Sequence, residues 1–345
     1  MTAASNLTVA LTFNKKKGVS PKSGEPKDLY AEFDADETIQ GISNALKSAG
    51  HKVILVEADE SAYAKLKGLK NEIDVVFNIA EGLKGEARES FIPAICELLQ
   101  IPYTGSGPLT LALTLDKART KEILKYHRIP TPKFQVFYTP SEMLNNKLKF
   151  PLIVKPLREG SSKGIKNNSL VNDENELKSR VQQIIRDYEQ PAIVEEFIAC
   201  REFTIAILGN ENPKILPIVE IKFDHLPGHI HKFDSYEAKW IYDNPGSNHD
   251  PLICPAKLSE KLESKIKKVC LDAYRTLDCK DWCRVDLRVR NGIPYILELN
   301  ALPGMIPDPK ENSRFPRAAF TAGMSYNDVV NEVLNLAVKR YNLAK

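Results

Sequence analysis

The stretch "WCRVDLRVRNGIPYILELN", residues 282–300, contains two apolar runs in which polar side chains recur at every second position. Alternate residues of a strand point to the same face, so Arg284 shares a face with Asp286, and Glu298 shares one with Asn300. If the two strands pair, two carboxylates and an amide oxygen converge, and such oxygen ligands suit magnesium. A strand face of alternating polar residues exposed to water is the competing interpretation. The spacing favours the ligand set, within the false-positive risk of any short motif.

A second stretch, "IVKPLREGSSKGI" at residues 153–165, places a lysine at the end of an apolar run and ahead of a hydroxyl-bearing loop. Lys155 is a compact point charge of the kind that binds phosphate. The loop can offer backbone N–H groups and hydroxyls to phosphate oxygens, with Gly160 and Gly164 supplying unusual backbone angles. It lacks the residue order of a P-loop. A flexible surface loop would be equally rich in glycine and serine, so that interpretation stays open.

The first hundred residues alternate between predicted strands and helices. "LTVALTF" (7–13) and "IDVVFNIAEG" (73–82) predict buried strands. Between them, a helix capped by Asp36 and stopped by Gly50 leads into another strand, and "RESFIPAICELLQ" predicts a helix after them. This alternation indicates a small parallel sheet covered by helices, over residues 1–104.

The segment "YTGSGPL" (103–109) interrupts this alternation and indicates a domain boundary. Beyond it, residues 105–195 predict a compact α+β unit, and residues 196–345 predict an α+β unit built on antiparallel strands. The predicted class is therefore α/β followed by α+β, in three domains. The expected elements after the boundary are helices at 116–127, 174–188, 259–276 and from about Tyr326, and strands at 134–138, 152–155, 192–197, 202–209, 214–221, 282–289 and 294–300.

The bulk composition is that of an ordinary globular protein. The chain has 345 residues, 43% of them hydrophobic and 27% charged, and its net charge of +3 does not indicate a nucleic-acid partner. No apolar stretch reaches the roughly 18–20 residues that span a bilayer, and no basic segment precedes the first apolar run, so neither a membrane span nor a signal peptide is expected. The six cysteines are scattered apart from "CKDWC" (279–283), which indicates reduced thiols in a cytoplasmic protein.

Nine short motifs occur along nearly the whole chain in one order: "PYTGSG", "LDKARTK", "VKPLREGSSKG", "EEF", "REFTIAILG", "SYEAKW", "CPA", "RVDLR" and "LELNALPGM". In this order and at about this spacing, they resemble the ATP-grasp superfamily and, within it, the D-alanine–D-alanine ligase family. The resemblance implies the three-domain ATP-grasp fold. So many ordered matches are more specific than any one of them.

The resemblance also implies which residues handle ATP. Lys117 and Lys155 would hold its phosphates, and Lys239 would reach the phosphate that is transferred. Glu195 would accept a hydrogen bond from the adenine amine, and Glu202 would bind the ribose hydroxyls. The other residues implied beside ATP are Phe197 and Ile198 at the adenine, and Ser161 and Ser162 in a loop that closes over the site.

The reaction centre is implied in the same way. Two magnesium ions, for which manganese could substitute, would be held by Asp286, Glu298 and Asn300. Arg284 and the backbone N–H of Gly304 would stabilise the anionic centre, as oxyanion donors do.

Three departures from the family pattern concern the amino-acid substrates. The family's hydrogen-bonded glutamate–serine–tyrosine triad is matched by Glu37 and Ser161, but Trp240 stands at the tyrosine position and can only donate. A Ser-Leu pair after "PGM" is replaced by Pro309 and Lys310. The family's N-terminal glycine-rich turn is replaced by an insertion at 13–34, and a His-Gly pair is replaced by Glu81-Gly82. The residues assigned to the altered acceptor pocket are Tyr236, Trp240, Lys310 and Arg314.

These features predict an ATP-dependent ligase that activates a carboxylate as an acyl phosphate and joins it to an amine. The default product is D-alanyl-D-alanine, with ADP and phosphate released. One alternative is a paralogue that joins a different amino acid to an amino acid or small metabolite, as mycosporine-type ligases do. A non-catalytic ATP-binding regulator is the alternative of another class. The expected partners are small amino-acid substrates, with no nucleic acid and no membrane, and a homodimer by family analogy.

Overall fold

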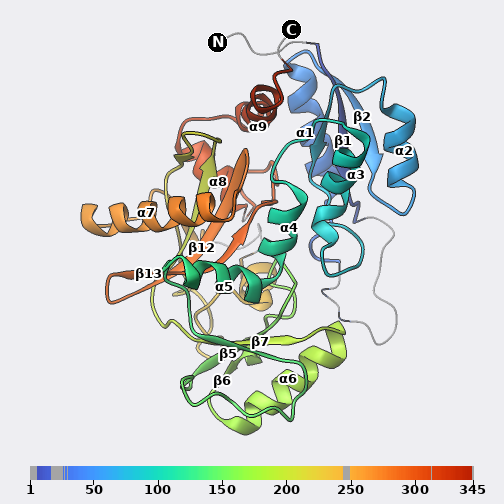
Figure 1. Cartoon of the computed structure of the whole chain (residues 1–345). Coiled ribbons are helices and arrows are strands. Elements are labelled where there is room, and N and C mark those ends of the chain that lie inside the picture. The colour runs from blue at the N-terminus through green and yellow to red at the C-terminus, as the bar shows by residue number, and fades with distance from the viewer. Residues whose placement is uncertain are drawn as a thin grey trace.

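Three sheets divide the protein into the units shown in Figure 1. The structure is a computed structural model that describes residues 6–16, 26, 28, 30–243, 249–311 and 313–343. Among these residues, no helix combines the length and the apolar character needed to cross a bilayer. The insertion at 13–34 lies in part outside the described residues.

The N-terminal unit is a parallel three-stranded sheet, as the alternation of strands and helices predicted. Strand β1 (Thr8–Phe13) lies in the middle, between β2 (Lys52–Glu57) and β3 (Val75–Asn78). Its middle strand is apolar because both faces are covered. The helices of this unit are α1 (Asp36–Ser48), α2 (Ala62–Leu69), α3 (Phe91–Leu99) and a 3₁₀ turn, η1 (Arg88–Ser90).

The predicted cap of α1 is wrong by one residue. Ala35 occupies the N-cap position and Asp36 begins the helix. Asp36 instead contributes negative charge to the first turn, where it complements the helix dipole, and it pairs with Lys15 at 2.6 Å. The helix ends before Gly50, whose φ of +89° fits the expected stop.

The central unit is an antiparallel four-stranded sheet with one helix packed on it. The strand order is β4 (Phe134–Phe137), β7 (Ala192–Glu196), β5 (Leu152–Pro156) and β6 (Leu170–Val171). Helix α6 (Glu174–Tyr188) is capped by the Asp173 side chain and turns Leu177, Val181 and Ile184 toward the sheet. A short 3₁₀ turn, η2 (Asn167–Ser169), precedes β6.

The C-terminal unit contains the antiparallel sheet that carries the motif at 282–300. Its strand order is β11 (Leu252–Ile253), β10 (Val219–Ile221), β8 (Glu202–Leu208), β12 (Trp282–Arg290) and β13 (Ile293–Asn300), and β9 (Lys214–Ile215) pairs with β8. The remaining elements are α7 (Glu260–Thr276), α8 (Arg314–Thr321), α9 (Tyr326–Arg340) and a π-helical turn, η3 (Ala238–Tyr242).

The expected pairing of the two polar-patterned strands is confirmed. Strands β12 and β13 are antiparallel neighbours, with Asp286 directly opposite Glu298 and Arg284 directly opposite Asn300. The register shifts immediately after Asp286, so the irregularity lies beside this group of polar residues.

Three helices of the described residues fall where none was predicted: α2, α4 (Pro108–Leu115) and α8. At α4 and α8, glycine and proline dominated the local pattern. Helix α4 begins inside the predicted boundary segment, with proline in its first turn, and α8 follows the "PGMIPDP" loop. Helices α4 and α5 (Lys117–Tyr126) pack against β13 of the C-terminal sheet. Part of the segment 105–195 therefore lies on the C-terminal unit, and the domain limits stay a prediction.

The end of the chain returns to the N-terminal unit. Helix α9 packs against α1, and Figure 1 shows it beside the parallel sheet. Arg340 on α9 donates from Nη2 to the backbone oxygens of Tyr103 (2.9 Å) and Gly105 (3.1 Å) and to Asp281 (2.8 Å). These contacts join the N-terminal and C-terminal units through one guanidinium group.

Candidate active site

Two cavities adjoin at the junction of the three units, because Glu159 and Glu298 line both of them. The larger has a volume of about 520 Å³, and the smaller has a volume of about 50 Å³. Residues that line the larger cavity include Lys117, Lys239, Arg284 and Gly304. Residues that line the smaller one include Lys155, Glu195, Phe197, Ile198, Glu202 and Asp286.

Asp286 is held by its neighbours on the sheet. Arg284 donates to it from Nη2 at 2.8 Å, Asn300 donates from Nδ2 at 3.1 Å, and Thr204 on β8 donates from Oγ1. Burial alone would raise the pKa of Asp286, but the Arg284 guanidinium holds it well below its usual range. The carboxylate is therefore ionised at neutral pH and fixed in one orientation.

Glu298 is less enclosed, and its partner comes from another element. Its side chain is 24% exposed, and Lys117 at the start of α5 lies 3.5 Å from it. The Nδ2 of Asn300 is used on Asp286, so its side-chain oxygen remains available as an acceptor. Two carboxylates and one amide oxygen thus meet at the end of β13, and this donor set fits a hard cation such as magnesium.

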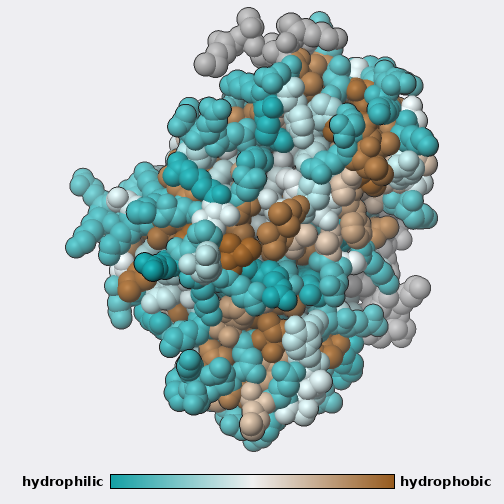
Figure 2. Space-filling view, viewed as in Figure 1, coloured by the Kyte–Doolittle hydropathy of each residue, from teal (hydrophilic) through white to brown (hydrophobic). Residues whose placement is uncertain are grey.

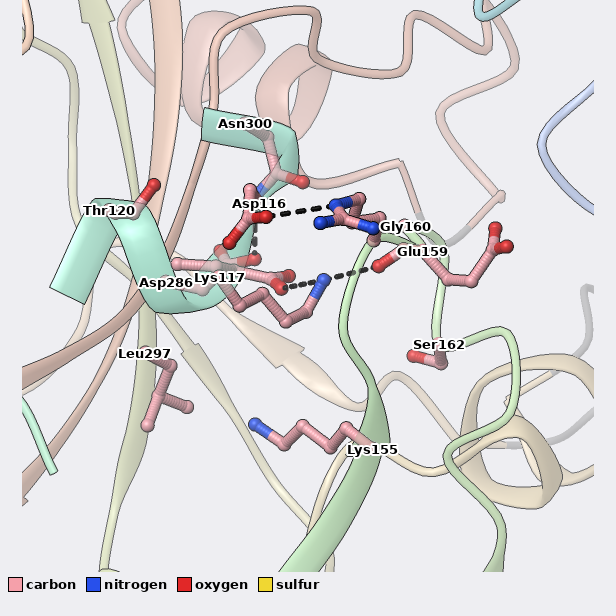
Figure 3. Close-up of polar contacts among 12 residues, drawn as sticks. Asp116, Lys117, Thr120, Lys155, Glu159, Gly160, Ser162, Asp286, Leu297 and Asn300 are labelled. Carbon is pink, nitrogen blue, oxygen red and sulfur yellow. Dashed lines mark hydrogen bonds and ion pairs between the residues drawn. The ribbon is translucent and has the colours of Figure 1, made fainter. Parts of the chain in front are cut away.

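Lys117 also touches the loop that follows β5. Its Nζ donates to the backbone oxygen of Glu159, and Figure 3 shows it reaching from the helix toward that loop. Asp116 caps the helix through the N–H groups of Ala118 and Arg119, and its other oxygen accepts from Arg158 at 2.8 Å. The start of α5 and the loop are therefore fixed against each other.

Lys155 lies in the smaller cavity beside a carboxylate that is wholly buried. Glu195 is 0% exposed and lies between Lys155, at 3.0 Å, and Lys121, at 3.2 Å. Lys121 also donates to the backbone oxygen of Leu297 (2.9 Å) and to Thr131 (3.1 Å). Burial lowers the pKa of Lys121 to about 8, against the opposing effect of Glu195.

Lys121 was not predicted as a site residue, although the sequence carries a signal for it. Lys121 stands four residues after Lys117, in the same quoted motif, so both lie on one face of α5.

Glu202, which also lines the smaller cavity, is buried and accepts a hydrogen bond from Arg288 at 2.9 Å. The Arg288 guanidinium lies 4.8 Å from the centre of the Phe197 ring.

The glycine–serine loop departs from expectation at one position. Gly164 has the expected positive φ (+67°), but Gly160 does not, and Ser161 (+48°) and Ser162 (+61°) adopt the left-handed conformation instead. Gly160 is needed for a different reason: a Cβ there would lie 2.6 Å from Glu32. Its N–H donates to that carboxylate at 2.5 Å.

Trp240 contacts the loop as a hydrogen-bond donor, the one hydrogen-bonding role that an indole N–H has. Its Nε1 donates to the backbone oxygen of Ser161 at 3.1 Å, and the Ser162 hydroxyl donates to the backbone oxygen of Asp234 at 3.0 Å. Arg314 is bidentate on the Asp234 carboxylate, with distances of 2.9 and 2.5 Å. The loop is therefore attached to the C-terminal unit on one side.

On its other side, the loop is attached to the N-terminal unit by an ion network of Glu32, Arg88, Glu159 and Lys163. Arg88 pairs with Glu32 (2.9 Å) and Glu159 (3.1 Å), and Lys163 pairs with the same carboxylates at 3.1 and 2.6 Å. Burial alone would raise the pKa of Glu32, but Arg88 and Lys163 lower it to about 2. The network has two cations and two carboxylates, so its charges cancel.

Glu32 occupies the place beside the loop that the sequence analysis assigned to Glu37. Glu37 is exposed in the first turn of α1 and lines the larger cavity. Among the described residues, no hydrogen bond or ion pair joins Glu37 to the loop. No local pattern marked Glu32, because its partners are 56 to 131 residues away.

The acceptor pocket is brought together only in part. Trp240 and Arg314 line the larger cavity, and so does Lys239, whose pKa burial and Arg314 lower to about 8. Tyr236 is half-buried outside the lining, and its N–H donates to Ile165. Lys310 is exposed and lies outside the lining as well.

Comparison with known proteins gives consistent matches over most of the chain. Residues 123–335 match the family model described as D-ala D-ala ligase C-terminus. The chain is 35% identical to a D-alanine–D-alanine ligase of Carboxydothermus hydrogenoformans, over 88% of this chain and 93% of that protein. It is 36% identical to the uncharacterized protein y4sG of Sinorhizobium fredii, over 86% of each.

The fold matches solved structures of the same kind. The crystal structure of a D-alanine–D-alanine ligase from Bacillus anthracis complexed with ATP superposes with a TM-score of 0.73 at 25% identity, over 98% of this chain and all of that chain. The fold and the site define an ATP-dependent, ADP-forming ligase of the ATP-grasp class. Within that class, the chain belongs to the D-alanine–D-alanine ligase family.

We expect Lys121→Met to raise the KM for ATP about tenfold, with a smaller effect on kcat. The substitution keeps the length of the side chain but removes one of two ammonium groups that orient Glu195, the residue that we expect beside the adenine. A hydrogen bond to a charged group contributes about 1.5–3 kcal/mol. Steady-state kinetics with varied ATP measures the effect. Lys125→Met, one turn along α5 at an exposed position, is the matched control, and equal KM values for the two variants would contradict the assignment.

We expect Arg88→Met to destabilise the protein by about 3–5 kcal/mol, because Glu32 and Glu159 would keep only one cation between them. Arg119→Met is the matched control. It removes an exposed ion pair with Glu122, which solvent screens, so this variant is expected to lose little stability. Urea unfolding at pH 7 measures both. A loss for Arg88→Met no larger than that for Arg119→Met would show that the network does not hold the loop.

Proposed function

We propose that the protein joins two amino acids, with D-alanyl-D-alanine as the default product. The observation that carries the proposal is the placement of Asp286 opposite Glu298, with Lys117 and Arg284 as their cations and Lys155 in the adjoining cavity. The curated relative from Carboxydothermus hydrogenoformans, which is named a D-alanine–D-alanine ligase, supports this product.

The proposed reaction has two steps. A carboxylate oxygen of the first amino acid attacks the γ-phosphorus of ATP, the bond to the ADP oxygen breaks, and an acyl phosphate forms. The amine of the second amino acid then attacks the acyl carbon, phosphate leaves, and the amine gives up a proton. Positioning and neutralisation of charge supply most of the rate in phosphoryl transfer. The cationic groups that face this chemistry are Lys117, Lys155, Lys239 and Arg284.

We assign Asp286, Glu298 and Asn300 to magnesium, with manganese as a substitute, because their oxygens form a donor set for a hard cation. When bound, magnesium neutralises phosphate charge and stabilises the charge that develops during transfer. Arg284 and Gly304 line the larger cavity. We assign the Arg284 guanidinium and the backbone N–H of Gly304 to the anionic reaction centre. The Ser161 loop, held from both sides, excludes water from the acyl phosphate.

A second candidate is a paralogue that ligates another amino acid. The observations that favour it are on the amino-acid side of the larger cavity, where Trp240 contacts the loop and Glu81 replaces a histidine. A non-catalytic regulator is disfavoured by the family membership and by the presence of all three metal-ligand candidates.

We further propose a cytoplasmic homodimer. Helices α3 and α4 pack together, and each exposes a leucine: Leu98 on α3 (71% exposed) and Leu109 on α4 (73% exposed). Figure 2 shows apolar surface gathered between the upper and lower parts of this face. Light scattering of the purified protein tests the dimer.

The activity is tested by incubating the protein with ATP, magnesium and D-alanine, alone and with other amino acids. Phosphate release and mass spectrometry of the product identify the reaction. The proposal expects phosphate, ADP and dipeptide in equal amounts. Phosphate release without any ligated product would contradict it.

Asp286→Asn should lower kcat by at least about 100-fold and raise the magnesium concentration needed for half-maximal rate. The shape of the side chain is kept, and Arg284 loses only the charge of its partner. Asp272→Asn, in an exposed pair with Lys268 on α7, is the matched control. Thermal melting checks that both variants fold. An unchanged magnesium dependence for Asp286→Asn would remove this residue from the metal site.

A further inference from the structure

The larger cavity has two walls of opposite charge. One wall carries the cationic groups of Lys117, Lys239, Arg284 and Arg314. The other comes from the N-terminal unit. Besides Glu32 and Glu37, it carries the carboxyl groups of Asp34, Glu81 and Glu89, and these three we call the acidic wall. A ligand that spans the cavity therefore meets positive charge at the reaction centre and negative charge opposite to it.

Within the described residues, no cation forms an ion pair with the carboxyl groups of the acidic wall; Lys16 also lines the cavity from the N-terminal unit, but its Nζ lies over the Trp240 ring, 5.9 Å from the ring centre. Glu89 is only 9% exposed, yet within the described ranges it makes no hydrogen bond and no ion pair, and Oδ2 of Asp34 is buried without a partner. No ion pair of the described chain involves Glu81 either. Arg88 and Lys163 lie near this wall, but Glu32 and Glu159 already use both of them.

Asn14 fixes the backbone beside two of these carboxyl groups. The N–H of Asp34 donates to the Asn14 backbone oxygen at 2.8 Å, and the N–H of Gly82 donates to its side-chain oxygen at 2.8 Å. Gly82 has a φ of +79°, and a Cβ there would lie 2.5 Å from the backbone oxygen of Arg88. The residue after Glu81 is therefore restricted to glycine, which keeps the backbone beside Glu81 in this conformation.

The proximity of these carboxyl groups makes ionisation unfavourable without a ligand. Burial and the neighbouring Glu89 raise the pKa of Glu81 well above its ordinary value, and burial raises that of Asp34 in the same direction. Burial, and next the Glu32 carboxylate, raise the pKa of Glu89 to about 7, against the lowering effect of Arg88. Unpaired acids in a cleft are groups that a cationic ligand would stabilise.

We propose that the acidic wall binds ammonium groups, and that one substrate is a diamino acid or an amine of equal charge rather than alanine. The inference rests on the proposed ATP-dependent ligation of amino acids and follows its second candidate. The carboxylate of the substrate faces Arg284 and Lys239, and its side-chain ammonium faces Glu81 and Glu89.

Two other occupants fit the wall less well. Within the described ranges, no group of three acidic, histidine or cysteine side chains is arranged to hold a metal ion, which disfavours a metal cation at the acidic wall. A single α-ammonium carries one positive charge and compensates one carboxylate, which leaves the others buried and unpaired. Two ammonium groups on a flexible chain compensate two of the three carboxyl groups instead of one.

The test compares diamino acids with neutral isosteres on the full-length enzyme with ATP and magnesium. Lysine is paired with norleucine and ornithine with norvaline, in both enantiomers, each alone and together with alanine. Phosphate release gives kcat/KM, and mass spectrometry identifies the product. At least one diamino acid is expected to exceed its isostere by about tenfold or more.

The double variant Glu81→Gln/Glu89→Gln keeps the shape of the wall and removes its charge. It should bring the preference for the diamino acid close to one by raising its KM. Glu86→Gln, at an exposed position of the same loop, should retain the preference. A wild-type enzyme that turns over isosteres as well as diamino acids, or a double variant that keeps the preference, would overturn the inference and leave ligation standing. No product from any pair, D-alanine included, would end both proposals.

Discussion

The antiparallel pairing of β12 with β13 is the constraint on which the site depends. It places Asp286 opposite Glu298, and β8 on the other side places Thr204 opposite Asp286. Directly opposed like charges destabilise a sheet, so this register is tolerated only with cations beside it. Arg284 comes from the same strand and Lys117 from α5. A slip of one residue would turn every one of these side chains to the other face.

The other buried carboxylates on the nucleotide side also have cations beside them. Glu195 lies between two lysines, Glu202 pairs with Arg288, and Asp234 pairs with Arg314. Such pairs add little net stability, but the loss of one partner is costly. These pairs satisfy the buried carboxylates with cations of the protein itself. On the proposed assignment of Lys117 and Lys155 to the phosphates of ATP, the phosphates would compete with Glu298 and Glu195 for the same ammonium groups.

The sequence predicted most of what depends on local spacing. Strand alternation identified Asp286 and Glu298 as a pair, and the motif at 153–165 identified Lys155. What it missed depends on contacts between distant segments. Glu32 is recognised only when Gly160, 128 residues away, donates to it. Likewise, Lys310 was assigned to the pocket by its position after a motif, but the loop it belongs to turns it to solvent.

The ATP side and the amino-acid side of the site differ in whether their carboxyl groups are paired with cations, and this difference has a physical reason. On the ATP side, every carboxylate discussed has a cation within 3.5 Å. A nucleotide is itself negatively charged, so an unpaired carboxylate on this side would repel it. On the amino-acid side, Glu81 and Glu89 are left without one. Unpaired acids are expensive to bury, and the backbone around Gly82 holds them there all the same. Unpaired buried carboxyl groups are stable in a folded enzyme only where a ligand of opposite charge compensates them or where they bind protons instead. The unpaired carboxyl groups therefore indicate a positively charged substrate.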